Sequence, residues 1–258
     1  MWPARTLSRV HPLLILAAAA YGALTGPLLA RPRYRLSVEP EEPWRSACPA
    51  GHPLPPAAQG GWLGTARCPH CPPATRRYGT GAGALTVWTA LVCAALAAAT
   101  GPHPELVVWL LAAPAVVLLA AVDLSVQRLP DPLTLPLAAA LPVALGVAAL
   151  SGSATGSWPR ALLGGLVLGA VYFVLFLINP RGMGFGDVKL AVPLGVAMGW
   201  YGWDVIFFGT FTGFLCAAGY GLILIVARRA TRKTAVPFGP FMALGALVAL
   251  LLGALAAA

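Results

Sequence analysis

The sequence predicts an all-α, multi-pass membrane protein with about eight transmembrane helices and a small cytosolic loop domain that carries a candidate zinc site. Of the 258 residues, 59% are hydrophobic and only 10% are charged, and the mean hydropathy is +0.79, far outside the range of soluble domains. Eight apolar stretches approach the roughly 20 residues that a spanning helix needs. They lie at about 11–30, 82–101, 105–123, 133–151, 161–179, 188–202, 205–227 and 238–257.

These stretches divide the chain into three parts. Residues 1–30 are predicted to form a first transmembrane helix, residues 31–81 a cytosolic Cys/His loop domain, and residues 82–258 a membrane domain of seven helices. The first apolar stretch follows a short basic start, as a signal peptide does. No convincing cleavage site precedes the loop domain, so we expect a retained helix.

Lys and Arg are unevenly distributed between the two sides of the predicted bundle. With eight spans both termini share one side, and that side holds three of the seventeen basic residues, while the other side holds fourteen. The positive-inside rule therefore places both termini outside a cytoplasmic (inner) membrane and four loops in the cytosol. Those loops are 31–81, 124–132, 180–187 and 228–237. The same distribution explains the net charge of +9, so no nucleic-acid partner is expected.

The loop domain contains four residues that could bind a metal ion. Cys68 and Cys71 form a Cys-x-x-Cys pair, and Cys48 and His52 precede them. Two thiolates on one tight turn suit tetrahedral zinc when a second pair completes the site. His70 is an alternative ligand. The other interpretation is a set of free thiols, since a reducing cytosol disfavours disulfides.

A glycine-dense turn, Arg181 to Leu190, ends one apolar stretch and opens the next. It contains Gly184, Gly186 and Asp187. The glycines would let another backbone approach closely. An ionisable residue at the mouth of a membrane helix is a functional candidate because its burial is unfavourable, and the helix dipole would favour the ionised form of Asp187. The alternative is a tight cytosolic loop with Asp187 as a helix N-cap.

A second carboxylate, Asp123, closes the third apolar stretch on the same predicted side. It should lie at or just inside the membrane edge, although a solvated loop carboxylate is the ordinary alternative. Asp131 stands between Pro130 and Pro132 and is expected at a turn or helix start. Lys189 is expected to be a cytosolic-face side chain that reaches the headgroups or a substrate.

Two carboxylates at one membrane face suggest acid–base hydrolysis. When two carboxyl groups lie within a few ångströms, both cannot ionise without a large penalty, so the pair holds one proton. The ionised group can then take a proton from an attacking water while the protonated group stabilises the oxyanion. From the dipole argument we expect Asp187 to be the base and Asp123 the acid.

These residues resemble a known family. Gly184-Phe185-Gly186-Asp187 resembles the GxGD signature of membrane aspartyl proteases, and the run from Gly182 to Leu190 resembles the type IV prepilin peptidases in particular. Asp123 with Leu129-Pro130-Asp131, and Pro237-Phe238-Gly239-Pro240-Phe241, also resemble segments of that family. The resemblance implies an aspartic endopeptidase with catalytic Asp123 and Asp187, supported by Gly184, Gly186 and Lys189. It would cleave the basic leader of type IV prepilins or pseudopilins at the cytosolic membrane face, and residues 82–258 would be the peptidase domain.

Many members of this family also methylate the new N-terminus with S-adenosylmethionine. This chain departs from their pattern in two places: Gly51 replaces the second Cys of one pair, and Gly22-Ala23-Leu24-Thr25-Gly26 replaces a motif at the end of the first helix. These departures count against N-methyltransferase activity, and S-adenosylmethionine is expected as a cofactor only if that activity is retained.

Two other functions compete with the peptidase. Asp123 and Asp187 could relay ions in a small transporter or channel, which predicts helices broken at mid-membrane and internal symmetry. A catalytically inactive homologue could also bind prepilins without cutting them. The sequence shows neither broken helices nor internal symmetry, which counts against the transporter. All the motif residues that cleavage needs are present, which counts against the inactive homologue.

Overall fold

The computed structural model describes residues 4–39, 41–56, 61–79, 81–180, 182–229 and 236–257, with only the backbone for residues 4–10. Arg181, Arg232 and Lys233, counted above among the basic residues, lie outside this part. The described chain is helical with two isolated β-bridges and no strand, which confirms the all-α prediction. The elements are α1 (Ala4–Thr25), the 3-10 turn η1 (Gly26–Leu29), α2 (Ala30–Leu36), α3 (Ala82–Thr100), α4 (Glu105–Val126), α5 (Asp131–Ala149), α6 (Trp158–Ile178), α7 (Phe185–Tyr201), α8 (Trp203–Val226) and α9 (Gly239–Ala257).

Seven helical segments of the described chain are long and apolar enough to cross a membrane. The first runs from His11 to Leu36, so the helical path continues past the predicted end near residue 30. Prolines in η1 and α2 do not interrupt it, because proline is tolerated in the first turn of a helix, where its missing N–H has no intrahelical partner. The additional helical turns, Ala30–Leu36, are rich in Arg. This polarity is why the sequence predicted a loop there.

The eighth long helix, α7, is the centre of the bundle. It has 17 residues, about 26 Å at 1.5 Å per residue, and twelve of them are buried. It packs most closely on α6, where a Cβ atom added to Gly164 would lie 2.6 Å from the carbonyl oxygen of Gly195. Such backbone contact through small residues is typical of membrane helix pairs. Besides α6, the helices α5, α8 and α9 also pack against α7.

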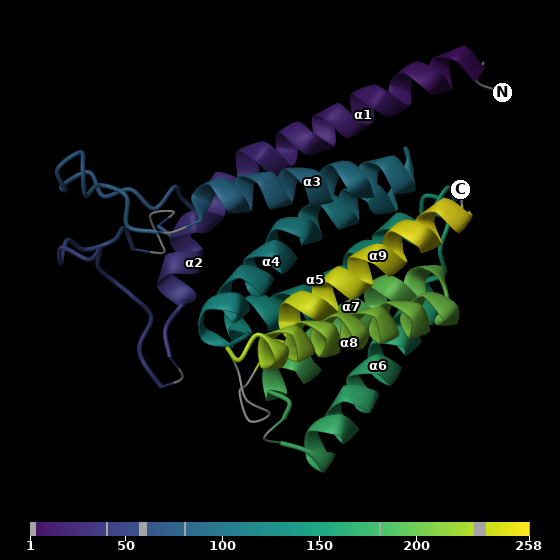
Figure 1. Ribbon diagram of the computed structural model, residues 1–258. Coiled ribbons are helices and arrows are strands. Elements are labelled where there is room, and N and C mark those ends of the chain that lie inside the picture. Colours follow the sequence, from purple (N-terminus) through teal and green to yellow (C-terminus); the bar gives the residue numbers. More distant parts are fainter. Residues whose placement is uncertain are drawn as a thin grey trace.

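The two ends of the bundle differ. The start of α1 and the end of α9 lie at one end, and the segment between α2 and α3 projects from the other (Figure 1). The turn from α4 to α5 and the first turns of α7 and α9 lie at the end with the loop, since Arg33 of α2 donates to the Ser125 hydroxyl at 3.2 Å and the Gly239 N–H reaches Asp123. Both predicted site regions therefore share one end of the molecule.

Candidate active site and metal centre

Asp123 lies in the last turn of α4. The helix ends just beyond it, because Gln127 adopts a left-handed conformation and its N–H donates to the Asp123 carbonyl at 2.8 Å. The side chain is 4% exposed, so it is not a solvated loop carboxylate. Its Oδ2 accepts a hydrogen bond from the Gly239 N–H at 3.0 Å. Gly239 is the first residue of α9, and the carboxylate thus lies at a helix N-terminus.

Asp187 lies in the first turn of α7 and is 7% exposed. Its Oδ2 accepts a hydrogen bond from the Gly184 N–H at 3.1 Å. Gly184 is the N-cap residue, so the interpretation of Asp187 as an N-cap is wrong: the residue is three positions further on and its side chain reaches back. This arrangement satisfies one of the N–H groups that every helix start leaves free.

The structure brings the two carboxylates to one place. They are close enough for the charge of Asp123 to act on Asp187. Leu129, in the turn after α4, packs against both helix starts: a Cβ atom on Gly186 would lie 3.0 Å from the Leu129 Cβ, and one on Gly239 would lie 3.4 Å from its Cδ2. Leu129 therefore sets the spacing between the two carboxylate-bearing segments.

Like charges and helix N-termini act in opposite directions at this site. Each carboxylate accepts a backbone N–H and lies at the positive end of a helix dipole, which favours ionisation. Two buried carboxylates repel one another, which favours one shared proton. Asp123 also lies in the last turn of α4, whose dipole disfavours ionisation, whereas Asp187 lies in the first turn of its own helix. The assignment of Asp187 as the base and Asp123 as the acid stays a prediction. The arrangement can hold one proton and exchange it with a bound water.

Asp131 and Lys189 form a pair beside the site. Asp131 is the first residue of α5, as expected for a helix start, and its Oδ1 accepts from the Lys189 Nζ at 2.6 Å. The Lys189 Nζ also lies 5.1 Å from the ring centroid of Phe185. Lys189 thus ties α7 to α5 and does not extend freely to the headgroups.

Sequence reasoning missed two neighbours of the carboxylates. Gly239 belongs to the segment from Pro237 to Phe241, which resembles the family, but every residue except proline has a backbone N–H. The identity of the residue therefore did not indicate that its N–H would bind Asp123. Tyr172 of α6 is 2% exposed and lies within electrostatic reach of Asp187. Tyr172 stands alone among apolar residues in the sequence of α6. This isolation could have indicated a polar neighbour, because a buried hydroxyl normally has a polar partner.

The predicted metal ligands lie on two tight turns of the loop domain. Ala47 and Pro53 form one isolated bridge and Arg67 and Arg77 the other. Within the first turn the Cys48 N–H donates to the His52 carbonyl at 2.9 Å, and Gly51 takes a left-handed conformation with φ of 84°. Each turn closes on itself by main-chain hydrogen bonds and presents its ligands to the other turn.

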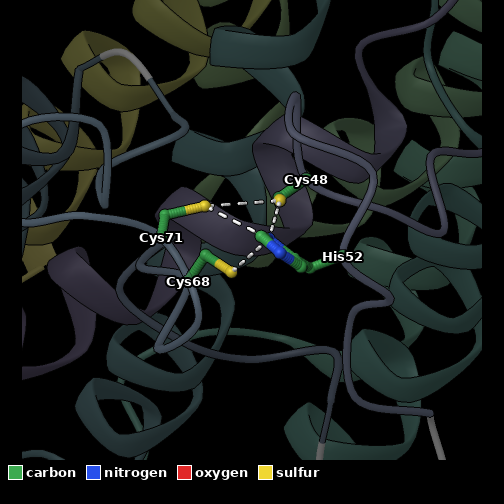
Figure 2. Close-up of side chains that lie close together, drawn as sticks. All are labelled: Cys48, His52, Cys68 and Cys71. Atoms are coloured by element: carbon green, nitrogen blue, oxygen red, sulfur yellow. Dashed lines mark hydrogen bonds between the residues drawn. The ribbon is translucent and has the colours of Figure 1, made fainter.

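Cys48, His52, Cys68 and Cys71 converge on one point (Figure 2). The Cys48 and Cys71 sulfurs are 3.8 Å apart, and His52 Nδ1 lies 3.3–3.6 Å from the three sulfurs. A tetrahedral ion with bonds of about 2.3 Å to sulfur and 2.0–2.1 Å to nitrogen requires edges of about 3.8 Å and 3.5 Å. The distance between the Cys48 and Cys71 sulfurs and the three distances to His52 Nδ1 match these values, and all four ligand atoms lie within 4.8 Å of one another. The cluster can therefore hold a metal ion. His70 stands outside it, with its ring centroid 5.6 Å from that of His52.

The charge state of the cluster favours a cation. Burial acts to raise the pKa of the Cys48 thiol, but hydrogen bonds from the backbone of Ala50 and His52 and from the side chains of His52 and Cys68 outweigh it and lower that pKa to about 6. Burial and the neighbouring sulfurs raise the pKa of Cys71 to about 12. The site thus contains a thiolate next to a thiol that a metal ion would deprotonate. Cys93 and Cys216 lie apart from it.

A bundle of apolar helices with two buried carboxylates at one end and a Cys/His loop beside them defines a multi-pass membrane peptidase. Comparison with known proteins specifies the family. Residues 110–257 match the model of the type IV leader peptidase family, and that segment contains Asp123, Asp187 and Gly239. The chain belongs to the type IV leader peptidase family.

Similar proteins extend the match to the N-terminal part. A prepilin leader peptidase/N-methyltransferase of Stutzerimonas stutzeri is 30% identical over 98% of this chain and 96% of its own length. Those of Aeromonas hydrophila and Burkholderia pseudomallei are 33% and 31% identical, each over 86% of this chain and over 74% and 70% of their own lengths. No solved structure matches the chain.

Proposed function

We propose that this protein is a membrane-embedded aspartic endopeptidase that removes the leader peptide of type IV prepilins or pseudopilins. Asp123 and Asp187 are its catalytic residues. One observation carries the assignment: two buried carboxylates from different helices are each held by a backbone N–H at a helix start, and both helix starts pack against Leu129. That the chain belongs to a leader peptidase family supplies the substrate class.

The chemistry requires no covalent intermediate. The ionised carboxylate takes a proton from a water whose oxygen attacks the scissile carbonyl carbon, and the protonated carboxyl donates to the carbonyl oxygen. As the tetrahedral species collapses, one hydroxyl returns its proton to the second carboxylate and the carbonyl re-forms. The C–N bond breaks, and the leaving amine takes the proton acquired by the first carboxylate, so both groups regain their starting states. The Gly184 and Gly239 N–H groups hold both carboxylates in place and compensate their negative charge.

The membrane side of the proposed active site is inferred from the distribution of Lys and Arg. Because the basic loops lie on the carboxylate-bearing end, the positive-inside rule places the active site at the cytosolic face of the inner membrane and both termini outside. A leader with basic residues would stay in the cytosol while the apolar segment after the cleavage site lies in the bilayer. N-methyltransferase activity is not extended to this chain, because of the departures at Gly51 and Gly22–Gly26.

Relay of ions is the weaker alternative. It predicts helices broken at mid-membrane, whereas α4 and α7, which carry Asp123 and Asp187, each run without a break. No buried chain of ionisable side chains leads from this pair through the described bundle toward Glu105 at the opposite end. A hydrolytic pair at one membrane face fits this placement better.

Asparagine substitutions test the catalytic assignment. In cells that express a prepilin, Asp123→Asn and Asp187→Asn should each lower the rate of leader removal by about 10²–10⁴-fold without loss of the folded protein. Asp204→Asn is the matched control, since Asp204 is exposed in the first turn of α8. Normal processing by either of the first two variants would refute the assignment.

We further propose that the Cys/His cluster binds one structural zinc ion. Its three cysteines and one histidine form a closed four-ligand set, which is typical of structural rather than catalytic zinc. The purified protein should contain about one zinc per chain, and the double variant Cys68→Ser, Cys71→Ser should contain none. Cys216→Ser, on the membrane helix α8, should keep its metal. A parent protein without metal would end the proposal.

A further inference from the structure

A groove of about 580 Å³ lies between α3, α4 and α9, with residues of α5 and α7 also lining it. On α4 its lining extends from Trp109 to Leu124, fifteen residue steps that span about 22 Å along the helix axis. On α9 it extends from Pro240 to Leu250. The groove is therefore long and runs parallel to the helices, a shape that suits an extended or helical segment better than a compact ligand.

The lining is almost entirely apolar. Arg33 is the one charged lining residue, and it already donates to Ser125. Alanines contribute from every wall, including Ala95, Ala112 and Ala243. Small residues let another helix approach closely, and in a bilayer such contacts drive helix association because apolar side chains gain nothing by leaving lipid.

The groove is open on the outer surface of the helix bundle. Trp88, Leu91 and Leu244 line it and are 62%, 55% and 45% exposed. In a membrane this surface contacts the acyl region, so an occupant can enter sideways from the bilayer.

The groove is continuous with the proposed active site. At its loop-side end it is lined by Leu124 and Pro240. Leu124 follows Asp123, and Pro240 follows Gly239, whose N–H donates to the Asp123 carboxylate. A segment lying in the groove thus has one end at the catalytic carboxylates.

We infer that this groove binds the apolar transmembrane helix of the substrate and places its N-terminal end at Asp123. The inference rests on the proposed function and adds the part of the substrate that is recognised. An acyl chain could fill the groove when it is free, but a lipid does not account for a groove that ends at a peptide-cleaving pair. The helix would deliver the peptide bond just before it to Asp123 and Asp187, while the basic leader remains outside the bilayer.

Two tryptophan variants that fill the groove test this. Ala112→Trp on α4 and Ala243→Trp on α9 should lower kcat/KM at least about tenfold for a full-length prepilin in detergent or vesicles. For a short peptide with the leader and cleavage site but without the apolar helix, their rates should stay within about twofold of the parent. Ala140→Trp is the matched control, because Ala140 is exposed on α5 and does not line the groove. The inference would be overturned if the two variants lost equal activity on both substrates, or lost none on the full-length prepilin. If the parent protein cleaved neither substrate, the proposed function itself would be refuted.

Cross-linking gives an independent measurement that does not need turnover. A benzophenone side chain at Leu247, inside the groove, should form an adduct with the apolar segment of a full-length prepilin in the Asp187→Asn background. The same group at Ala140 should not. Adducts of equal yield at both positions, or none at Leu247, would place the substrate helix elsewhere.

Discussion

The two glycines of Gly184-Phe185-Gly186 have different tasks. A Cβ atom on Gly184 would make only ordinary contacts, 3.6 Å from the Asp187 Oδ2 and 3.9 Å from the Gly186 nitrogen, and its backbone is extended with φ of −75°. The role of Gly184 is therefore to donate its N–H. A Cβ on Gly186 would lie 3.0 Å from the Leu129 Cβ, which is anchored to the backbone and cannot rotate away.

Alanine substitution should separate these tasks. Gly186→Ala should push the turn after α4 away from α7 by a few tenths of an ångström, change the carboxylate spacing and lower the cleavage rate by about tenfold, since small misplacements of reacting groups have large effects. Gly184→Ala keeps the N–H and should stay within about threefold of the parent. Initial rates on one prepilin measure both, and a larger loss in Gly184→Ala than in Gly186→Ala would contradict this account.

Gly239 is the corresponding position at Asp123. A Cβ there would lie 2.9 Å from the Asp123 Oδ2 and 3.3 Å from its Cγ. The carboxylate is the mobile end of a side chain, so Gly239→Ala should fold but displace it from the helix start. We expect a loss of about ten- to a hundredfold in cleavage rate with a nearly unchanged melting temperature. Gly219→Ala, where a Cβ meets nothing within 4 Å, should leave both quantities unchanged, and equal rates in the two variants would exclude a role for this contact.

At the level of single residues, the sequence predicted some features of the candidate site and not others. Asp123, Asp187 and the four Cys/His residues could be selected from the sequence because charged or soft ligand atoms are unusual in their surroundings, and the structure gathers each set at one place. The burial of both carboxylates was an expectation from helix limits. The sequence did not predict three features: the hydrogen bond from the Gly239 N–H, the position of Leu129 and the proximity of Tyr172. Each depends on how helices far apart in sequence pack together, and a backbone donor cannot be recognised from the residue type.

At the scale of elements, the pair of Asp131 and Lys189 links α5 to α7. The ion pair measures 2.6 Å, but the side chains are 54% and 23% exposed, so solvent screens it and its contribution to stability should be below about 1 kcal/mol. Its position matters more than its strength. Lys189 lies two residues beyond Asp187 and fixes the first turn of α7 relative to the turn that carries Leu129.

A double-mutant cycle measures that link. Asp131→Asn and Lys189→Gln should each lower the cleavage rate by about two- to fivefold, the range that coupling energies below about 1 kcal/mol allow. The double variant should lose no more than either single one, because both remove the same contact. Melting temperatures should change little in all three. Independent, multiplying losses would show that the two residues act separately.

Element limits were the least predictable part of the fold. The first helix was expected to end near residue 30 because Arg and Pro follow, yet helix continues to Leu36. There α2 lies at the end of the membrane segment, where arginine side chains can reach polar surroundings. The sixth apolar stretch was expected to begin at 188, but α7 starts at Phe185, because the Asp187 side chain caps the glycine turn. Both errors come from polar residues that favour loops until tertiary contacts satisfy them.

At the scale of the whole molecule, the loop domain and the bundle share one core. The buried cluster around Cys48, Cys68 and Cys71 includes Leu118 and Val122 of α4, and Val122 precedes Asp123. Hydrogen bonds reinforce the junction: Arg33 donates to Ser125 at 3.2 Å, and Arg128 donates to the Glu39 carbonyl at 3.1 Å. The turns that carry the Cys/His cluster therefore cover the last turns of α4, the helix that carries Asp123.

Metal removal should thus weaken the peptidase through α4. A domain this small cannot hold its turns by apolar burial alone, so loss of the ion should unfold them and expose Val122, which is fully buried. The double variant Cys68→Ser, Cys71→Ser should melt at a lower temperature and cleave prepilin about tenfold more slowly, as should the parent protein after treatment with a strong chelator. Re-addition of zinc should restore the chelated parent but not the variant, and Cys216→Ser should match the parent throughout. If the variant retained the parent's rate and melting temperature, the loop would be a separate unit, and the position of Asp123 would depend on the membrane helices alone.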